Sequence, residues 1–182
     1  MIKFPNFIIS VVSLETSLIQ FFPEIFLAIS ILLLTLHTTV LSTTRFLGYP
    51  LLVQSFIRLC FLILALTLFL VTYNNLSFTA DFDKNSFRSI LVFNNTFIFD
   101  SLSQSSKQLL LVSVLFCLFI AEKIILKNRI NTFEYFILSL CATLGLLFLT
   151  SVYDLISLYL AIEIQSLCLY VLAASKKNLL FL

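Results

Sequence analysis

An acidic side chain lies in the middle of a long apolar segment. Glu163 falls within residues 155–174, which are otherwise apolar enough to cross a membrane as a helix. An ionised carboxylate at that depth costs roughly 2.5–3.5 kcal/mol on insertion scales, so an acid kept there predicts a functional site. Three polar residues, Tyr159, Ser166 and Tyr170, share its side of the helix. This polar stripe must face protein or water, and its predicted chemistry is proton exchange.

The carboxylate of Glu163 has a second interpretation, in which it pairs with a cation on another helix and only fixes the packing. The cationic candidates at depth in this chain are Arg58 and His37. Arg58 lies about two turns from a basic end of its span and is expected to extend toward the surface. His37 is expected to cap carbonyl groups near the end of the first span. We therefore favour proton exchange, with the cation supplied by another polypeptide.

Five further acidic residues lie at the expected ends of spans: Glu24, Asp100, Glu122, Glu134 and Asp154. For Glu24, Glu134 and Asp154, at expected helix starts, capping or compensation of the helix dipole is favoured. A single internal carboxylate does not make a path across a hydrocarbon core of about 30 Å. The chain is therefore predicted to be incomplete as a proton pump.

Membrane-spanning helices are the elements that must position these residues. Of the 182 residues, 60% are hydrophobic and 11% are charged, whereas soluble domains are about 25% charged. A helix needs about 20 apolar residues to span a bilayer. The sequence therefore predicts an all-α integral membrane protein with five transmembrane helices, at residues 21–41, 51–73, 102–120, 133–153 and 155–174.

Charge asymmetry gives the predicted orientation. Seven of the 11 Lys and Arg residues fall on one side of the membrane, and the more basic side is the cytoplasm or its mitochondrial equivalent, the matrix. This places the N-terminus outside and the C-terminus in the matrix. The chain then divides into an interfacial N-terminal segment (1–20), helices one and two (21–73), a polar loop on the intermembrane side (74–101), helices three to five (102–177) and a C-terminal tail (178–182).

Composition argues against several classes of function. The four cysteines lie singly inside apolar runs, which argues against zinc, iron–sulfur, haem and disulfide sites. With two glycines, the chain has no phosphate-binding loop. The net charge of +2 is too dispersed for nucleic acid. No cofactor is predicted within the chain itself, and bound lipid such as cardiolipin is the small-molecule ligand that we expect.

A family resemblance covers residues 21–177 and is strongest after Thr132. Residues 151–177 read SVYDLISLYLAIEIQSLCLYVLAASKK. They resemble the fourth-to-fifth helix region of NADH dehydrogenase subunit 2, an antiporter-like membrane subunit of mitochondrial respiratory complex I. The segments PEIF at 23–26 and TFEYF at 132–136 add weaker support. The resemblance implies that Glu163 matches the fifth-helix glutamate of the family, which pairs with a seventh-helix lysine in proton translocation.

The same resemblance implies a setting in the mitochondrial inner membrane. Full-length members have about fourteen helices in inverted repeats, so a second polypeptide is expected to carry the remaining helices of a split subunit. A degenerate remnant is the other explanation, and retention of Glu163 argues against it. Neighbouring subunits 4L and 4 are the expected partners, while NADH, FMN, iron–sulfur clusters and ubiquinone are expected elsewhere in the complex. A purely structural assembly subunit and an independent ion transporter are the alternative functions.

Overall fold

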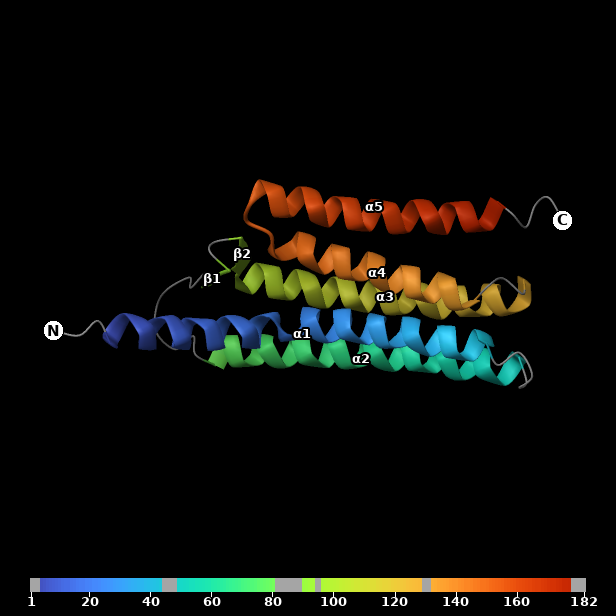
Figure 1. The fold of residues 1–182 in the computed structure, drawn as a ribbon, viewed down its shortest axis with the longest axis horizontal. Coiled ribbons are helices and arrows are strands. Elements are labelled where there is room, and N and C mark those ends of the chain that lie inside the picture. The colour runs from blue at the N-terminus through green and yellow to red at the C-terminus, as the bar shows by residue number, and fades with distance from the viewer. Residues whose placement is uncertain (1–3, 44–48, 81–89, 94–95, 129–131, 178–182) are drawn as a thin grey trace.

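The computed structural model describes residues 4–43, 49–80, 90–93, 96–128 and 132–177. This part of the chain forms five long helices and one short pair of strands (Figure 1). In Figure 1 the helices lie along a common axis, and the first turns of α1 extend past the end of the others. The elements are α1 (Phe4–Thr43), α2 (Tyr49–Ala80), β1 (Ile90–Val92), β2 (Phe97–Phe99), α3 (Ser101–Asn128), α4 (Thr132–Ser151) and α5 (Leu155–Lys177).

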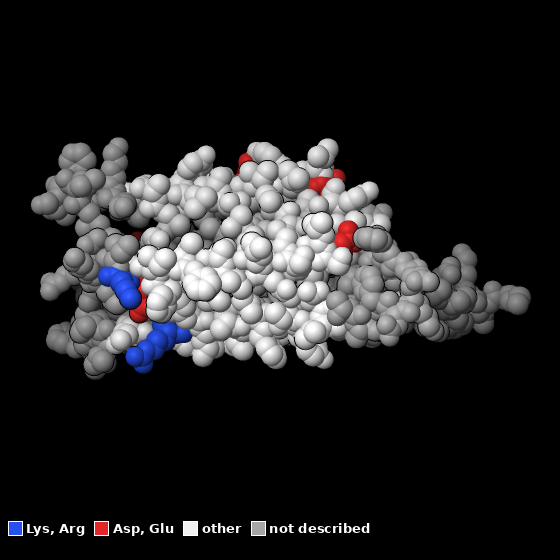
Figure 2. All heavy atoms as spheres, turned by 180° about the vertical axis from the view of Figure 1, so that it is seen from behind, with Lys and Arg blue, Asp and Glu red and all other residues white. Residues whose placement is uncertain are grey.

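Each of the five helices contains a segment that is long and apolar enough to cross a membrane, which confirms the predicted all-α integral membrane fold. The basic side chains visible in Figure 2 lie at the end of the bundle away from the projecting start of α1. In the orientation predicted from the charge count, which stays a prediction, this end faces the matrix. The spanning segments are Leu18–Val40, Gln54–Leu76, Ser101–Lys123, Phe133–Ser151 and Leu155–Ala174.

Two helices are longer than the sequence indicated. α1 begins at Phe4, so it continues through the segment predicted to be separate and interfacial. α2 continues past Asn74 and Asn75, where the second span was predicted to end, as far as Ala80. A run of apolar residues shows which part of a helix lies in lipid. The helix itself can continue beyond that part, because its backbone hydrogen bonds also form outside the membrane.

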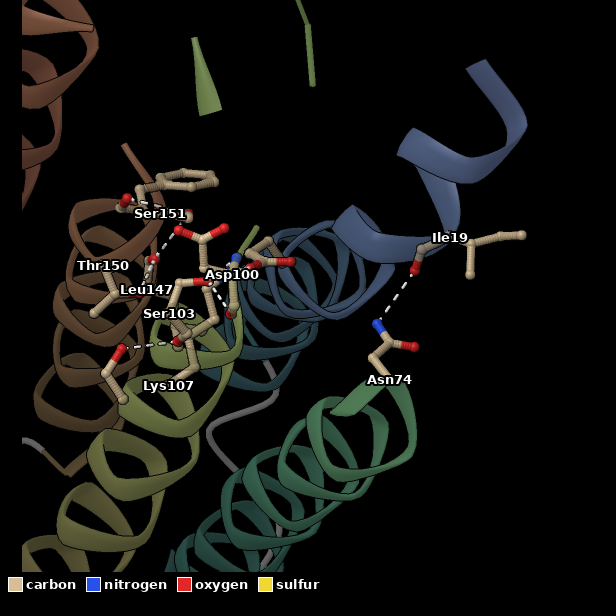
Figure 3. Close-up of polar contacts among 11 residues, drawn as sticks. Ile19, Asn74, Asp100, Ser103, Lys107, Leu147, Thr150 and Ser151 are labelled. Atoms are coloured by element: carbon tan, nitrogen blue, oxygen red, sulfur yellow. Dashed lines mark hydrogen bonds and ion pairs between the residues drawn. The ribbon is translucent and has the colours of Figure 1, made fainter. Parts of the chain in front are cut away.

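Pro23 lies inside α1 and removes one backbone donor from the helix. The carbonyl group of Ile19, four residues earlier, therefore lacks its usual helical partner. The side-chain amide of Asn74 on α2 donates to this carbonyl at 3.2 Å (Figure 3). This hydrogen bond joins α2 to α1 close to the position of Glu24.

The predicted polar loop contains an antiparallel strand pair, β1 and β2, that the sequence had not indicated. This pair is attached to the connection between α4 and α5. Phe97 forms an isolated bridge with Val152, and the backbone N–H of Tyr153 donates to the carbonyl of Thr96 at 2.9 Å. The strand pair thereby covers the end of the bundle at which α3 and α5 begin (Figure 1).

Aromatic rings form a small second core beneath the strand pair. The ring centroid of Phe21 on α1 lies 5.0 Å from that of Phe97, 5.9 Å from that of Phe99 and 5.8 Å from that of Phe148 on α4. Aromatic pairs at such separations contribute about 0.5–1.5 kcal/mol each beyond the burial of their area. The rings therefore hold α1, α4 and the strand pair together at this end.

The main core lies between α1, α2, α3 and α4, and it is built from aliphatic and aromatic side chains such as Leu27, Phe56, Leu64, Leu111 and Leu140. α5 packs on α4 at the edge of the bundle (Figure 1). Only 6% of the spanning segment of α5 is buried. Most of the surface of α5 therefore faces away from the described bundle.

α4 and α5 approach each other closely at Gly145. A Cβ atom at this position would lie 3.2 Å from the backbone nitrogen of Gln165 and 3.3 Å from the carbonyl oxygen of Ala161. These distances are shorter than ordinary van der Waals contact, so glycine is the residue that fits this crossing. Because Glu163 lies between Ala161 and Gln165, the close approach also fixes its position relative to α4.

Candidate functional site

Glu163 is half-buried near the middle of α5. The hydroxyl group of Tyr159, one turn earlier, donates a hydrogen bond to Glu163 Oε1. The hydroxyl of Ser166 donates to the backbone carbonyl of Glu163 at 3.0 Å, and this bond does not involve the carboxylate of Glu163. Tyr170 is 70% exposed. Of the four residues in the predicted stripe, Tyr159 and Glu163 are the two whose side chains form a hydrogen bond with each other.

Within the described ranges, Glu163 has no cationic partner. The two cations considered from the sequence, Arg58 on α2 and His37 on α1, are both exposed. A basic group donated to Glu163 by another polypeptide stays a prediction.

An unexpected ion pair joins Glu24 of α1 to Lys107 of α3. Lys107 Nζ lies 2.5 Å from Glu24 Oε1, and each side chain is 1% exposed. The prediction that Glu24 caps a helix start is wrong, because α1 begins at Phe4 and Glu24 therefore lies inside the helix. The positions predicted for the other two acids are confirmed, since Glu134 lies in the first turn of α4 and Asp154 immediately precedes α5.

A signal for this pair emerges once the structure gives the bounds of the spans. Glu24 lies six residues inside Leu18–Val40, and Lys107 lies six residues inside Ser101–Lys123. The first and third spans of an antiparallel bundle start on the same side of the membrane, so these opposite charges are expected at equal depth. Equal depth does not establish contact, because it does not reveal that α1 and α3 face each other at this level.

The aromatic core covers the ion pair on the side of the strand pair. The ring centroid of Phe99, at the end of β2, lies 4.3 Å from Lys107 Nζ. A cation over an aromatic face gains about 0.5–2 kcal/mol, with the larger values in desolvated sites. Lys107 is thus held by a carboxylate from α1 and by an aromatic ring from β2.

Metal binding finds no support in the described side chains. No cluster of three or more His, Cys, Asp or Glu residues in that part of the chain could hold a metal ion. All four cysteines, Cys60, Cys117, Cys141 and Cys168, are free thiols.

The chain is similar to NADH-ubiquinone oxidoreductase chain 2 of plant mitochondria. It is 35% identical to the Marchantia polymorpha protein over 164 residues, which cover 90% of this chain and 32% of the relative. It is 36% identical to the Arabidopsis thaliana protein over 157 residues, which cover 86% of this chain and 30% of the relative. This chain therefore spans about a third of the length of the mitochondrial relatives that it matches.

A bacterial protein shows the same likeness over a shorter segment. NADH-quinone oxidoreductase subunit N of Methylobacterium nodulans is 40% identical over 89 residues, which cover 49% of this chain and 18% of the relative. No family model matches the chain.

Proposed function

Because this chain is homologous to NADH-ubiquinone oxidoreductase chain 2, of which it spans about a third, we propose that it is the N-terminal portion of that subunit. In this proposal it belongs to the proton-translocating membrane arm of respiratory complex I in the mitochondrial inner membrane. NADH, FMN, iron–sulfur clusters and ubiquinone bind to other subunits. This chain contributes to proton movement without a redox centre of its own, and lipid such as cardiolipin binds to its outer surface.

The observation that carries the proposal is the placement of Glu163. Its carboxylate accepts a hydrogen bond from Tyr159. The helix that carries both residues has only 6% of its spanning segment buried in the bundle. Ionisable groups within a membrane face protein or water, because exposure to lipid is costly. We propose that the rest of the subunit packs on the open surface of α5 and brings a lysine toward Glu163, and that a second polypeptide supplies it.

Substitution of Glu163 by Gln in the assembled complex tests this role. The amide keeps the size of the side chain and its hydrogen bonding to Tyr159 but does not exchange protons at neutral pH. We expect the complex to assemble and to lose proton pumping in proteoliposomes. Glu134→Gln, which changes an exposed glutamate in the first turn of α4, is the matched control and should pump normally. Unchanged pumping by Glu163→Gln would favour a purely structural subunit.

The identity of the second polypeptide is tested separately. Chemical cross-linking of the purified complex should connect residues of α5 to a chain whose first spanning helices include an intramembrane lysine. A complex in which the open face of α5 contacts lipid alone would contradict the split-subunit proposal.

A further inference from the structure

The ion pair between Glu24 and Lys107 plays no part in the proposed role of Glu163. Both side chains are 1% exposed, so two ionisable groups are held in the interior of the bundle. A buried ion pair is a poor stabiliser, since well-packed apolar residues of similar volume often stabilise a fold equally well or better. Ionisable residues inside membrane proteins instead mark ion and proton routes. We therefore expect the Glu24–Lys107 pair to have a chemical role in addition to any structural one.

Two acceptor atoms beside this pair receive no hydrogen bond from the described residues. They are Glu24 Oε2 and Gln20 Oε1, both buried. Gln20 and Glu24 are one turn apart on α1, which brings their Cβ atoms to about 5–6 Å. A water molecule carries two donor hydrogens, and a buried water typically makes about three hydrogen bonds. The two atoms therefore match a single water that donates to both.

One face of α3 is polar from Lys107 back to the start of the helix. Asp100, Ser103 and Gln104 precede Lys107 at helical spacing, so they share its face. Ser103 is 4% and Gln104 3% exposed. The hydroxyl of Ser103 accepts from the backbone N–H of Asp100 at 2.9 Å and donates to its carbonyl at 2.8 Å. In Figure 3, Asp100, Ser103 and Lys107 follow one another along α3.

Aromatic rings lie on the side of the pair that faces the strand pair. The ring of Phe99 covers Lys107 Nζ, and the ring of Phe21 packs among aromatic residues of α4 and the strand pair. The polar groups next along the two helices are Gln20, one turn before Glu24 on α1, and the polar face of α3 that precedes Lys107. These two groups provide an approach to each partner of the ion pair.

We propose that Glu24 and Lys107 form a second proton-exchange site, with a water bound between Glu24 Oε2 and Gln20 Oε1. A proton delivered by this water forms an O–H bond at Glu24. One N–H bond of Lys107 then breaks, and its proton leaves along the polar face of α3, so that both partners are neutral. Transfer of the Glu24 proton to Lys107 Nζ restores the charges, so the pair has taken up one proton and released another at the end of the bundle where the spans of α1 and α3 begin. This inference rests on the proposed function and adds to it a site distinct from Glu163.

The double variant Glu24→Gln with Lys107→Met tests proton exchange without leaving a lone buried charge. We expect the assembled complex to pump at most about half the protons per NADH of the unmodified complex. Ser30→Ala is the matched control, because Ser30 is buried on the same helix and its hydroxyl bonds to the carbonyl of Leu27. Full pumping by the double variant overturns the inference. Glu163→Gln, measured in parallel, shows separately whether the proposed function holds.

The water site is tested with the ion pair intact, in case the double variant does not assemble. A cryo-EM map of the complex should show water density within hydrogen-bonding distance of Glu24 Oε2 and Gln20 Oε1. The density should be lost in Gln20→Leu, and pumping should fall with it. A map of the unmodified complex without this density overturns the inference, as does a density that persists in Gln20→Leu.

Discussion

The side-chain amide of Asn74 donates to the backbone carbonyl of Ile19, which Pro23 has left without its helical donor. A carbonyl freed by a proline inside a membrane helix is commonly satisfied by a donor on a neighbouring helix, and here Asn74 supplies it. The proline and the asparagine are therefore coupled, although they lie on different helices. This coupling can be measured.

Asn74→Leu should lower the free energy of unfolding by about 1 kcal/mol, since it removes the donor to Ile19. In a Pro23→Ala background the alanine N–H restores the helical hydrogen bond, and the same substitution should then cost much less. Thermal unfolding of the four members of this cycle measures the difference. Equal effects in the two backgrounds would show that Asn74 does not serve the carbonyl of Ile19.

Lys107→Met alone should destabilise the protein by about 3–5 kcal/mol, because it leaves the carboxylate of Glu24 buried without a counter-charge. The double variant that also carries Glu24→Gln should recover most of this loss. Thermal midpoints of the purified complex, together with the yield of assembled complex, provide the measurement. A single variant as stable as the parent would mean that Glu24 reaches bulk solvent or another cation.

Tyr159→Phe should slow proton pumping by about tenfold, because hydrogen bonds to charged groups contribute about 1.5–3 kcal/mol. The phenyl ring keeps the volume of tyrosine, so assembly should be normal. Tyr73→Phe removes a hydroxyl from an exposed tyrosine on α2 and serves as the control. If both variants pump at the parental rate, the hydrogen bond from Tyr159 has no role in proton transfer.

Gly145→Ala should destabilise the contact between α4 and α5 by about 1 kcal/mol, and Gly145→Val by up to about 3 kcal/mol, because the added atoms force the helices apart. Ala65→Val, at an exposed position of α2, should have little effect. Thermal unfolding and pumping should decline in the same order. A Gly145→Val variant with full stability would indicate that α5 can move away from α4 without cost.

Features governed by local sequence were predictable. The five spans follow from runs of apolar residues, and the contact between Tyr159 and Glu163 follows from their spacing of one helical turn. The Glu24–Lys107 pair joins residues 83 apart in sequence, so it depends on which helix faces share the interior. The short strands β1 and β2 pair through backbone groups and rest on the connection before α5, and no side-chain pattern indicates such docking.

β2 connects two parts of the molecule that sequence separates. One of its ends bridges to Val152, just before α5, and the other places the ring of Phe99 over Lys107. The residue that contacts the connection before α5 and the residue that covers the lysine are two positions apart on one short strand. The strand therefore links the start of the helix that carries Glu163 to the ring that covers Lys107 in the interior of the bundle.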